Sequence, residues 1–184
     1  MGDVFEGTRQ GCYLYSRHTN PSNSYLGQAI SEMEYTKGAI LSASGMGAIS
    51  STILQICSSN DEIVSSRTIY GGTYAFMKNY LPKFKIKTTF VDTTKIDQIE
   101  SAITEKTKII FCETMSNPLL EVSDINAISK LAKKYNIKFA LEQKNFRMKN
   151  KKNQNPANKI QDLQFFGEFG GVNPSIADSS TFTY

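Results

Sequence analysis

Residues 108–141 read KIIFCETMSNPLLEVSDINAISKLAKKYNIKFAL, and this stretch decides the fold class. Lys108–Glu113 is a short run of mostly apolar residues that predicts a strand, and Ile137–Leu141 predicts another. Between them, Asp124–Tyr135 has apolar residues at three- and four-residue spacing and lysines near its end, which predicts an amphipathic helix. A strand, a helix and a second strand in this order predict a βαβ unit with parallel strands.

The same alternation extends upstream. Three more strands are predicted, at Ala39–Ala43, Glu62–Ser66 and Ile86–Val91. Three more helical patterns occupy Ala48–Cys57, Gly72–Tyr80 and Lys95–Thr104. We therefore predict an α/β fold with a partial, doubly wound, mainly parallel sheet that carries helices on both faces. Because such a sheet cut after five strands exposes an apolar edge and face, we expect the isolated chain to aggregate or to depend on a partner.

The composition is typical of a soluble globular protein, with 184 residues, 40% of them hydrophobic and 21% charged. No run approaches the roughly 20 apolar residues of a membrane-spanning helix, and no secretory signal precedes the fold. Three widely spaced cysteines and a single histidine, His18, argue against a metal site and favour reduced thiols in the cytoplasm. The net charge of +4 does not require a nucleic-acid partner.

Changes in composition divide the chain into four parts. Residues 1–37 form an N-terminal segment, and residues 38–142 form a partial cofactor-binding α/β domain. Residues 143–160 are polar and lack periodicity, as in a linker. Residues 161–184 are rich in Gly, Ser, Thr and aromatic residues and are expected to form an extended arm.

The glycine-rich turn Ser42–Ala48 joins the first predicted strand to the first predicted helix. A helix N-terminus presents unpaired N–H groups and a partial positive charge, so a phosphate group is its natural ligand. Gly45-x-Gly47-x-x-Ser50 also nearly matches a dinucleotide fingerprint. In that alternative, Arg67 at the end of the second predicted strand would suit the 2′-phosphate of NADP.

Three further segments could contribute to a ligand site. Tyr70 follows the second predicted strand, at the same edge of the sheet, and its ring could stack on a flat cofactor. Asn117 precedes Pro118, which favours an extended backbone and a defined side-chain direction. Tyr15 and Arg17 lie two apart in a segment expected to be extended, so they could form a phosphate clamp. Each is also consistent with packing, a turn or a surface arginine, but several loops that converge on one edge favour a ligand site.

Taken in order, four segments of the chain resemble the Cys/Met-metabolism family of pyridoxal-phosphate enzymes, whose members include methionine γ-lyase, cystathionine γ-lyase, cystathionine γ-synthase and O-acetylhomoserine sulfhydrylase. They are Tyr15-Ser16-Arg17…Asn20-Pro21, Ala43-Ser44-Gly45-Met46, Tyr70-Gly71-Gly72-Thr73-Tyr74 and Glu113-Thr114-x-x-Asn117-Pro118. The resemblance implies an aspartate aminotransferase-like fold, pyridoxal 5′-phosphate as the cofactor and an amino-acid substrate. It also implies γ-elimination or γ-replacement on sulfur amino acids or activated homoserine.

The resemblance assigns a role to each matching site residue. Gly45 and Met46 would bind the cofactor phosphate through backbone N–H groups. Tyr70, the predicted catalytic residue, would stack on the pyridine ring, and Asn117 would lie beside the 3′-oxygen.

Other roles implied by the resemblance involve a neighbouring subunit or depart from the family pattern. Tyr15 and Arg17 would reach the phosphate in the next subunit, which implies a homo-oligomer. Glu142 stands where the family has an aspartate that pairs with the pyridinium nitrogen, and its side chain is one methylene longer. Gly72 stands where methionine γ-lyases of the best-known type carry cysteine, which favours the cystathionine lyases or the sulfhydrylases.

The match to the family ends after Leu141. The family's Ser-x-Thr-Lys segment, which supplies the Schiff-base lysine, does not occur in these 184 residues. Residues 166–182 resemble instead the arm that precedes the Tyr-x-Arg motif in the family. One hypothesis is therefore an incomplete, rearranged enzyme that is inactive alone, and the alternative is a non-catalytic partner of a full-length paralogue.

Overall fold

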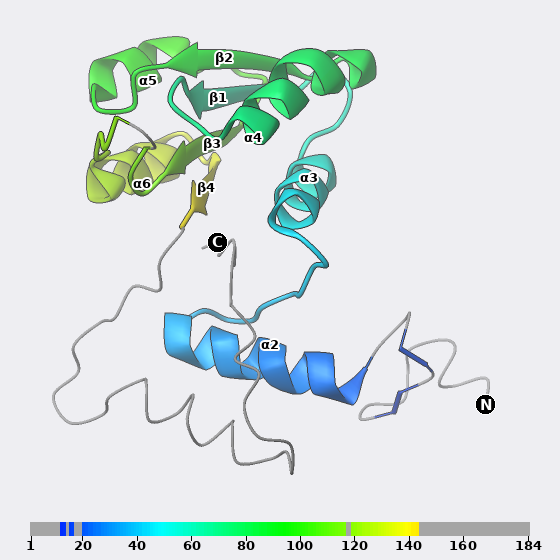
Figure 1. Ribbon diagram of the computed structural model, residues 1–184. Helices are drawn as coiled ribbons and strands as arrows, with labels where there is room; N and C mark the ends of the chain where they lie inside the picture. The colour runs from blue at the N-terminus through cyan, green and yellow to red at the C-terminus, as the bar shows by residue number, and fades with distance from the viewer. Residues whose placement is uncertain (1–11, 14, 17–19, 117–118, 144–184) are drawn as a thin grey trace, which may run out of the picture. The chain divides into compact units, whose positions relative to one another are not determined.

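The computed structural model describes residues 12–13, 15–16, 20–116 and 119–143 (Figure 1). These residues fall into two compact units, one that ends at Leu41 and one that begins at Ser42. The predicted linker, apart from Gln143, and the predicted arm at residues 161–184 lie outside the described residues. The predicted domain boundaries therefore stay predictions.

The first unit contains helix α2, Pro21–Glu34. The side chain of Asn20 caps its start by accepting hydrogen bonds from the backbone N–H groups of Ser22 and Asn23 at 2.8 and 3.2 Å. Proline suits the first helical position because the N–H that it lacks has no partner there in any helix. A Cβ on Gly27 would lie 2.9 Å from the carbonyl oxygen of Ala39, so only glycine allows the following chain to pass this close to the helix.

The second unit is built on a four-stranded parallel sheet in the order β2-β1-β3-β4 (Figure 1). The strands are β1 Glu62–Ser66, β2 Lys87–Val91, β3 Thr107–Glu113 and β4 Lys138–Glu142. Its helices are α3 Gly45–Ile56, α4 Gly71–Ala75, α5 Ile96–Ala102 and α6 Ile125–Lys134. Helix α4 continues as a π-helical turn, η1 Phe76–Tyr80, and a 3₁₀ turn, η2 Leu81–Phe84. Pro82 cannot donate to residue 78, which explains why regular α-helix does not extend across it.

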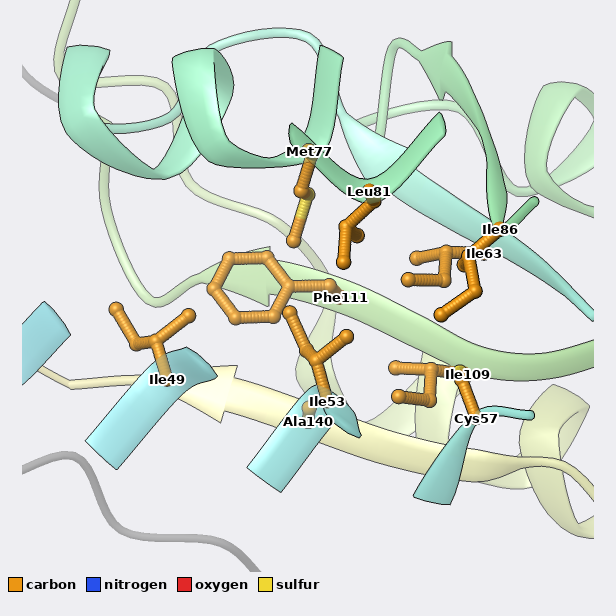
Figure 2. Packing of buried hydrophobic residues seen from close by; sticks show 10 residues of the cluster. All are labelled: Ile49, Ile53, Cys57, Ile63, Met77, Leu81, Ile86, Ile109, Phe111 and Ala140. Atoms are coloured by element: carbon orange, nitrogen blue, oxygen red, sulfur yellow. The ribbon is translucent and has the colours of Figure 1, made fainter. Parts of the chain in front are cut away.

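The two faces of the sheet bury separate hydrophobic clusters. On one face, Phe111 of β3 packs among residues of α3 and of the α4–η2 segment, as Figure 2 shows for Ile49, Ile53, Met77 and Leu81. On the other face, Val64, Ile110 and Cys112 pack against residues of α5 and α6 that include Ile99, Ile128 and Leu131. Successive strand residues alternate between the faces, so both layers of helices are fixed by one sheet. The predicted doubly wound α/β fold is confirmed.

One predicted strand is wrong. Residues 39–43 form no β-ladder with any described strand, and Ile40 is 98% exposed. The segment has suitable residues, but a strand also needs a neighbour that pairs with its backbone, and neither β2 nor β4 provides one. In the described part of the chain, no helix is both long enough and apolar enough to span a membrane.

Candidate functional site

The strand order places a reversal of winding between β1 and β3. The chain moves from β1 outward to β2, crosses back to β3, and then moves outward in the opposite direction to β4. Loops that leave β1 and β3 therefore diverge to opposite faces and open a crevice at the carboxyl ends of these strands. Open α/β sheets bind their ligands at such a point.

The start of helix α3 is arranged to receive an anion. Ser44 caps the helix, with its hydroxyl 3.0 Å from the N–H of Gly47, and Gly45 and Met46 are the first two helical residues. Their N–H groups belong to the first turn, where no intrahelical acceptor exists. A Cβ on Gly47 would lie 2.5 Å from the hydroxyl oxygen of Ser42 and 3.1 Å from that of Ser44. The turn is thus a hydroxyl-lined cradle that a side chain at residue 47 would fill.

Tyr70 is fixed to the next strand but one. It follows β1, and its backbone N–H donates a 2.7 Å hydrogen bond to Oε1 of Glu113, the last residue of β3. Glu113 is only 3% exposed, so this bond crosses the crevice from a buried anchor. The Tyr70 ring is 54% exposed and lies over Gly72, where a Cβ would come within 2.5 Å of its Cε1 atom. The ring is therefore presented at the crevice by a fixed backbone.

Helices α3 and α4 also meet directly at this edge. The buried hydroxyl of Thr73, in α4, lies 3.6 Å from the sulfur of Met46. The phosphate turn and the Tyr70 segment are thereby held together, as the sequence predicted from their position after neighbouring strands.

Glu142 ends β4 and is half-buried. It is in register with Glu113, and its carbonyl oxygen accepts a hydrogen bond from the N–H of Thr114 at 3.0 Å. The structure therefore brings Gly45, Met46, Tyr70 and Glu142 to one edge of the sheet.

Two predicted site residues, Arg17 and Asn117, lie outside the described residues. Tyr15 belongs to the unit that ends at Leu41, where it is 45% exposed. Sequence analysis did not assign a role to Glu113 or to Thr73, although a glutamate that ends a strand beside the crevice was a usable signal for Glu113.

Arg67 does not fit a site for a 2′-phosphate. Its guanidinium lies 3.3 Å from a carboxylate oxygen of Asp92 and 3.5 Å from one of Glu121. The hydroxyl of Thr68 donates to Glu121 at 3.2 Å as well. Hydrogen bonds from Thr94, and then the charge of Arg67, lower the pKa of Asp92, so the ionised carboxylate persists. Two carboxylates around one guanidinium would repel a phosphate, which argues against the NADP alternative.

Comparison with known proteins decides between the two cofactors. The family described as Cys/Met metabolism PLP-dependent enzyme, where PLP is pyridoxal 5′-phosphate, matches residues 1–145. The chain belongs to this family. L-Methionine gamma-lyase of Fusobacterium nucleatum subsp. polymorphum is 40% identical over 120 residues, which are 65% of this chain and 30% of that protein. Cystathionine gamma-lyase of Bacillus subtilis is 38% identical over 122 residues, or 66% of this chain and 32% of that protein.

A solved structure supports the same assignment for the fold. The putative O-acetylhomoserine (thiol)-lyase of Campylobacter jejuni, which carries N′-pyridoxyl-lysine-5′-monophosphate, has a TM-score of 0.73 and 34% identity. The match covers 77% of this chain and 35% of that one. The fold is therefore that of the aspartate aminotransferase-like PLP enzymes, and the resemblance seen in the sequence is confirmed. The chain spans about a third of the length of the relatives that it matches.

Proposed function

We propose that this chain supplies the phosphate-binding side of a PLP site in an enzyme that performs γ-elimination or γ-replacement on sulfur amino acids or activated homoserine. The observation that carries the proposal is the cradle at Gly47, because an anion fits a capped helix start from which a side chain is excluded. Methionine and cystathionine gamma-lyases among the relatives support the substrate class. When bound, the cofactor supplies an electron sink for reactions at amino-acid carbons.

The protein's own groups bind and orient the cofactor. The N–H groups of Gly45 and Met46 would donate to the phosphate, and the positive end of the α3 dipole would favour its charge. Tyr70 would lie against the pyridine ring, in a position set by the hydrogen bond between its N–H and Glu113. Glu142 would stabilise a proton on the ring nitrogen. Asn117 would lie beside the 3′-oxygen.

Calorimetric titration of the full chain with pyridoxamine 5′-phosphate, and with pyridoxamine as its phosphate-free counterpart, tests the cradle. Neither compound needs a Schiff-base lysine. Gly47→Val should weaken binding of the phosphate form by roughly tenfold or more, since several charge-assisted hydrogen bonds depend on this turn. Gly38→Val is the matched control, because a Cβ at Gly38 meets no atom within 4 Å. Equal affinity of Gly47→Val and the unaltered chain would refute the proposal.

A non-catalytic partner of a full-length relative is the second candidate. The observation that favours it is the lack of Ser-x-Thr-Lys in these 184 residues. Visible absorbance after addition of PLP separates the candidates. A new band that survives gel filtration and disappears with borohydride indicates a lysine-linked cofactor, which supports the enzyme, whereas retention of the free-cofactor spectrum supports the partner.

Association is part of the proposal. Tyr15 and Arg17 would complete the phosphate site in a neighbouring subunit, so we propose a homo-oligomer or a complex with a full-length paralogue. Light scattering after gel filtration tests this, and a monodisperse monomer that melts cooperatively would contradict it. The three free cysteines support a cytoplasmic location.

A further inference from the structure

Strand β2 lies at one end of the sheet, away from the cofactor site (Figure 1). Only one side of β2 pairs with β1: the N–H of Lys87 donates to Asp61 at 3.1 Å, and the carbonyl of Val91 accepts from Arg67 at 2.8 Å. Backbone groups alternate sides along a strand, so the N–H and C=O groups of Thr88 and Phe90 point away from β1. No strand in the described part of the chain pairs with them there.

A cavity of about 400 Å³ lies beside this edge. Its walls combine apolar residues with lysines and one threonine: Met77, Pro82, Ile86, Phe90, Lys78, Lys85, Lys87 and Thr88. The hydroxyl oxygen of Thr88 is buried and has no hydrogen-bond partner among the described residues. A buried hydroxyl without a partner is unfavourable, so a ligand that brings one is favoured at this place. We call the cavity together with the free side of Thr88 and Phe90 the β2 groove.

The chain around the β2 groove is positively charged. The 29 residues between Glu62 and Asp92 contain one arginine and four lysines but no acidic residue. The described contacts leave most of this charge uncompensated: Lys78 donates to the hydroxyl of Tyr74 at 2.8 Å, and Lys83 lies over the ring of Tyr80. Lys87 lies 3.7 Å from a carboxylate oxygen of Glu62 but is 71% exposed. An anionic partner is therefore favoured.

We propose that the β2 groove binds an extended, acidic peptide segment of a partner protein, which adds to β2 as a further strand. The outward N–H and C=O groups of Thr88 and Phe90 would bond the backbone of the incoming segment. Alternate side chains of that segment would enter the cavity, where glutamate suits it best. Its methylene groups would cover the apolar wall, and its carboxylate would reach the lysines. A lone phosphate would use the lysines but not the strand edge, so the edge favours a peptide.

A fluorescent peptide of alternating glutamate and valine tests the proposal by anisotropy on the full chain at low, fixed salt. The variant Lys78→Asn/Lys85→Asn should bind about tenfold more weakly, since two rim charges are lost. Asparagine tolerates the left-handed conformation of residue 85, where φ is 60°. The matched control is Lys130→Asn/Lys133→Asn, two exposed lysines of α6 on the other face, which should bind within twofold of the unaltered chain. Equal weakening by both pairs would overturn the proposal.

The peptide backbone supplies a second measurement that needs no protein variant. N-methylation of every second residue removes the donors on one side of the peptide strand, and the complementary set removes those on the other side. One of the two methylated peptides should lose binding by roughly tenfold or more, while the other binds like the parent. Equal binding of both to the unaltered chain, or full displacement of the peptide by inorganic phosphate at the same ionic strength, would show an anion site and refute strand addition. The outcome does not depend on PLP binding.

Discussion

Glu113→Ala is the substitution that most directly tests how the crevice is held together. The carboxylate of Glu113 is 3% exposed and accepts the 2.7 Å hydrogen bond from the N–H of Tyr70. This bond fixes the loop after β1 to the end of β3. Its loss should therefore destabilise the fold and also free Tyr70 from its position at the crevice.

The size of the effect can be worked out from these contacts. A hydrogen bond to a charged acceptor contributes about 1.5–3 kcal/mol, and removal of the buried methylene costs about 0.8 kcal/mol more. Relief of the desolvation cost of the carboxylate offsets part of this sum. We expect a net loss of about 2 kcal/mol, which corresponds to a fall of about 1 M in the midpoint of urea unfolding.

Urea unfolding followed by circular dichroism measures the stability, and hydrogen exchange of the Tyr70 amide reports the bond itself. Glu113→Gln keeps an acceptor at the same place and should lose about half as much, while Glu105→Ala, at an exposed glutamate, should change little. Binding of pyridoxamine 5′-phosphate should weaken in the order Gln, then Ala. The reasoning is refuted if Glu113→Ala unfolds at the same urea concentration as the unaltered chain and its Tyr70 amide stays equally protected.

Three other predictions concern the core, acid stability and the thiols. Phe111→Ala should cost about 3–5 kcal/mol in urea unfolding, because Phe111 is fully buried between helices and its removal leaves a cavity. The pKa of Asp92 is lowered by hydrogen bonds from Thr94, so its contribution is present above the unfolded pKa and is lost as pH falls through the folded one; the stability gap between the unaltered chain and Asp92→Asn should close below about pH 4, measured by urea unfolding at each pH. Burial raises the pKa of Cys57 and Cys112 to about 12, so a thiol reagent at pH 8 should modify both only after the chain unfolds, as counted by mass spectrometry.

Periodicity was sufficient to predict most of the fold. The strands predicted at Glu62–Ser66, Ile86–Val91, Lys108–Glu113 and Ile137–Leu141 form within one residue of their predicted bounds, because each is buried between two helical layers and its apolar run reflects that burial. Burial of both faces is a local property of the residues, so it is visible in the sequence.

Two errors show what local signals leave out. Residues 39–43 have the composition of a strand, but pairing depends on a neighbour that composition does not specify. Helix α2 was not predicted, although Asn20 followed by Pro21 is a strong helix start. Its buried positions are few, Gly27, Ile30 and Ser31, so the apolar period that reveals the other helices is weak here.

The candidate site was predicted as a set of loops, and its geometry was not. Position after a parallel strand placed Tyr70 and Glu142 at the correct edge. The bond between Tyr70 and Glu113 depends on the register of β1 against β3, in which Ser65 pairs with Phe111. Register is set by packing on both faces rather than by the turn sequence, so this contact could not be predicted from the residues alone.

The strand order connects the cofactor crevice to the β2 groove. Because winding reverses between β1 and β3, the crevice lies inside the sheet and β2 becomes the outermost strand on its side. A chain that continued to wind in the direction of β3 and β4 would add strands beyond β4 and would leave β2 at the edge. The lysines around Thr88 then have a physical role, since charged side chains beside an open strand oppose its pairing with identical edges. The same charges attract an acidic segment, so one arrangement both discourages self-association at this edge and selects the partner that we propose.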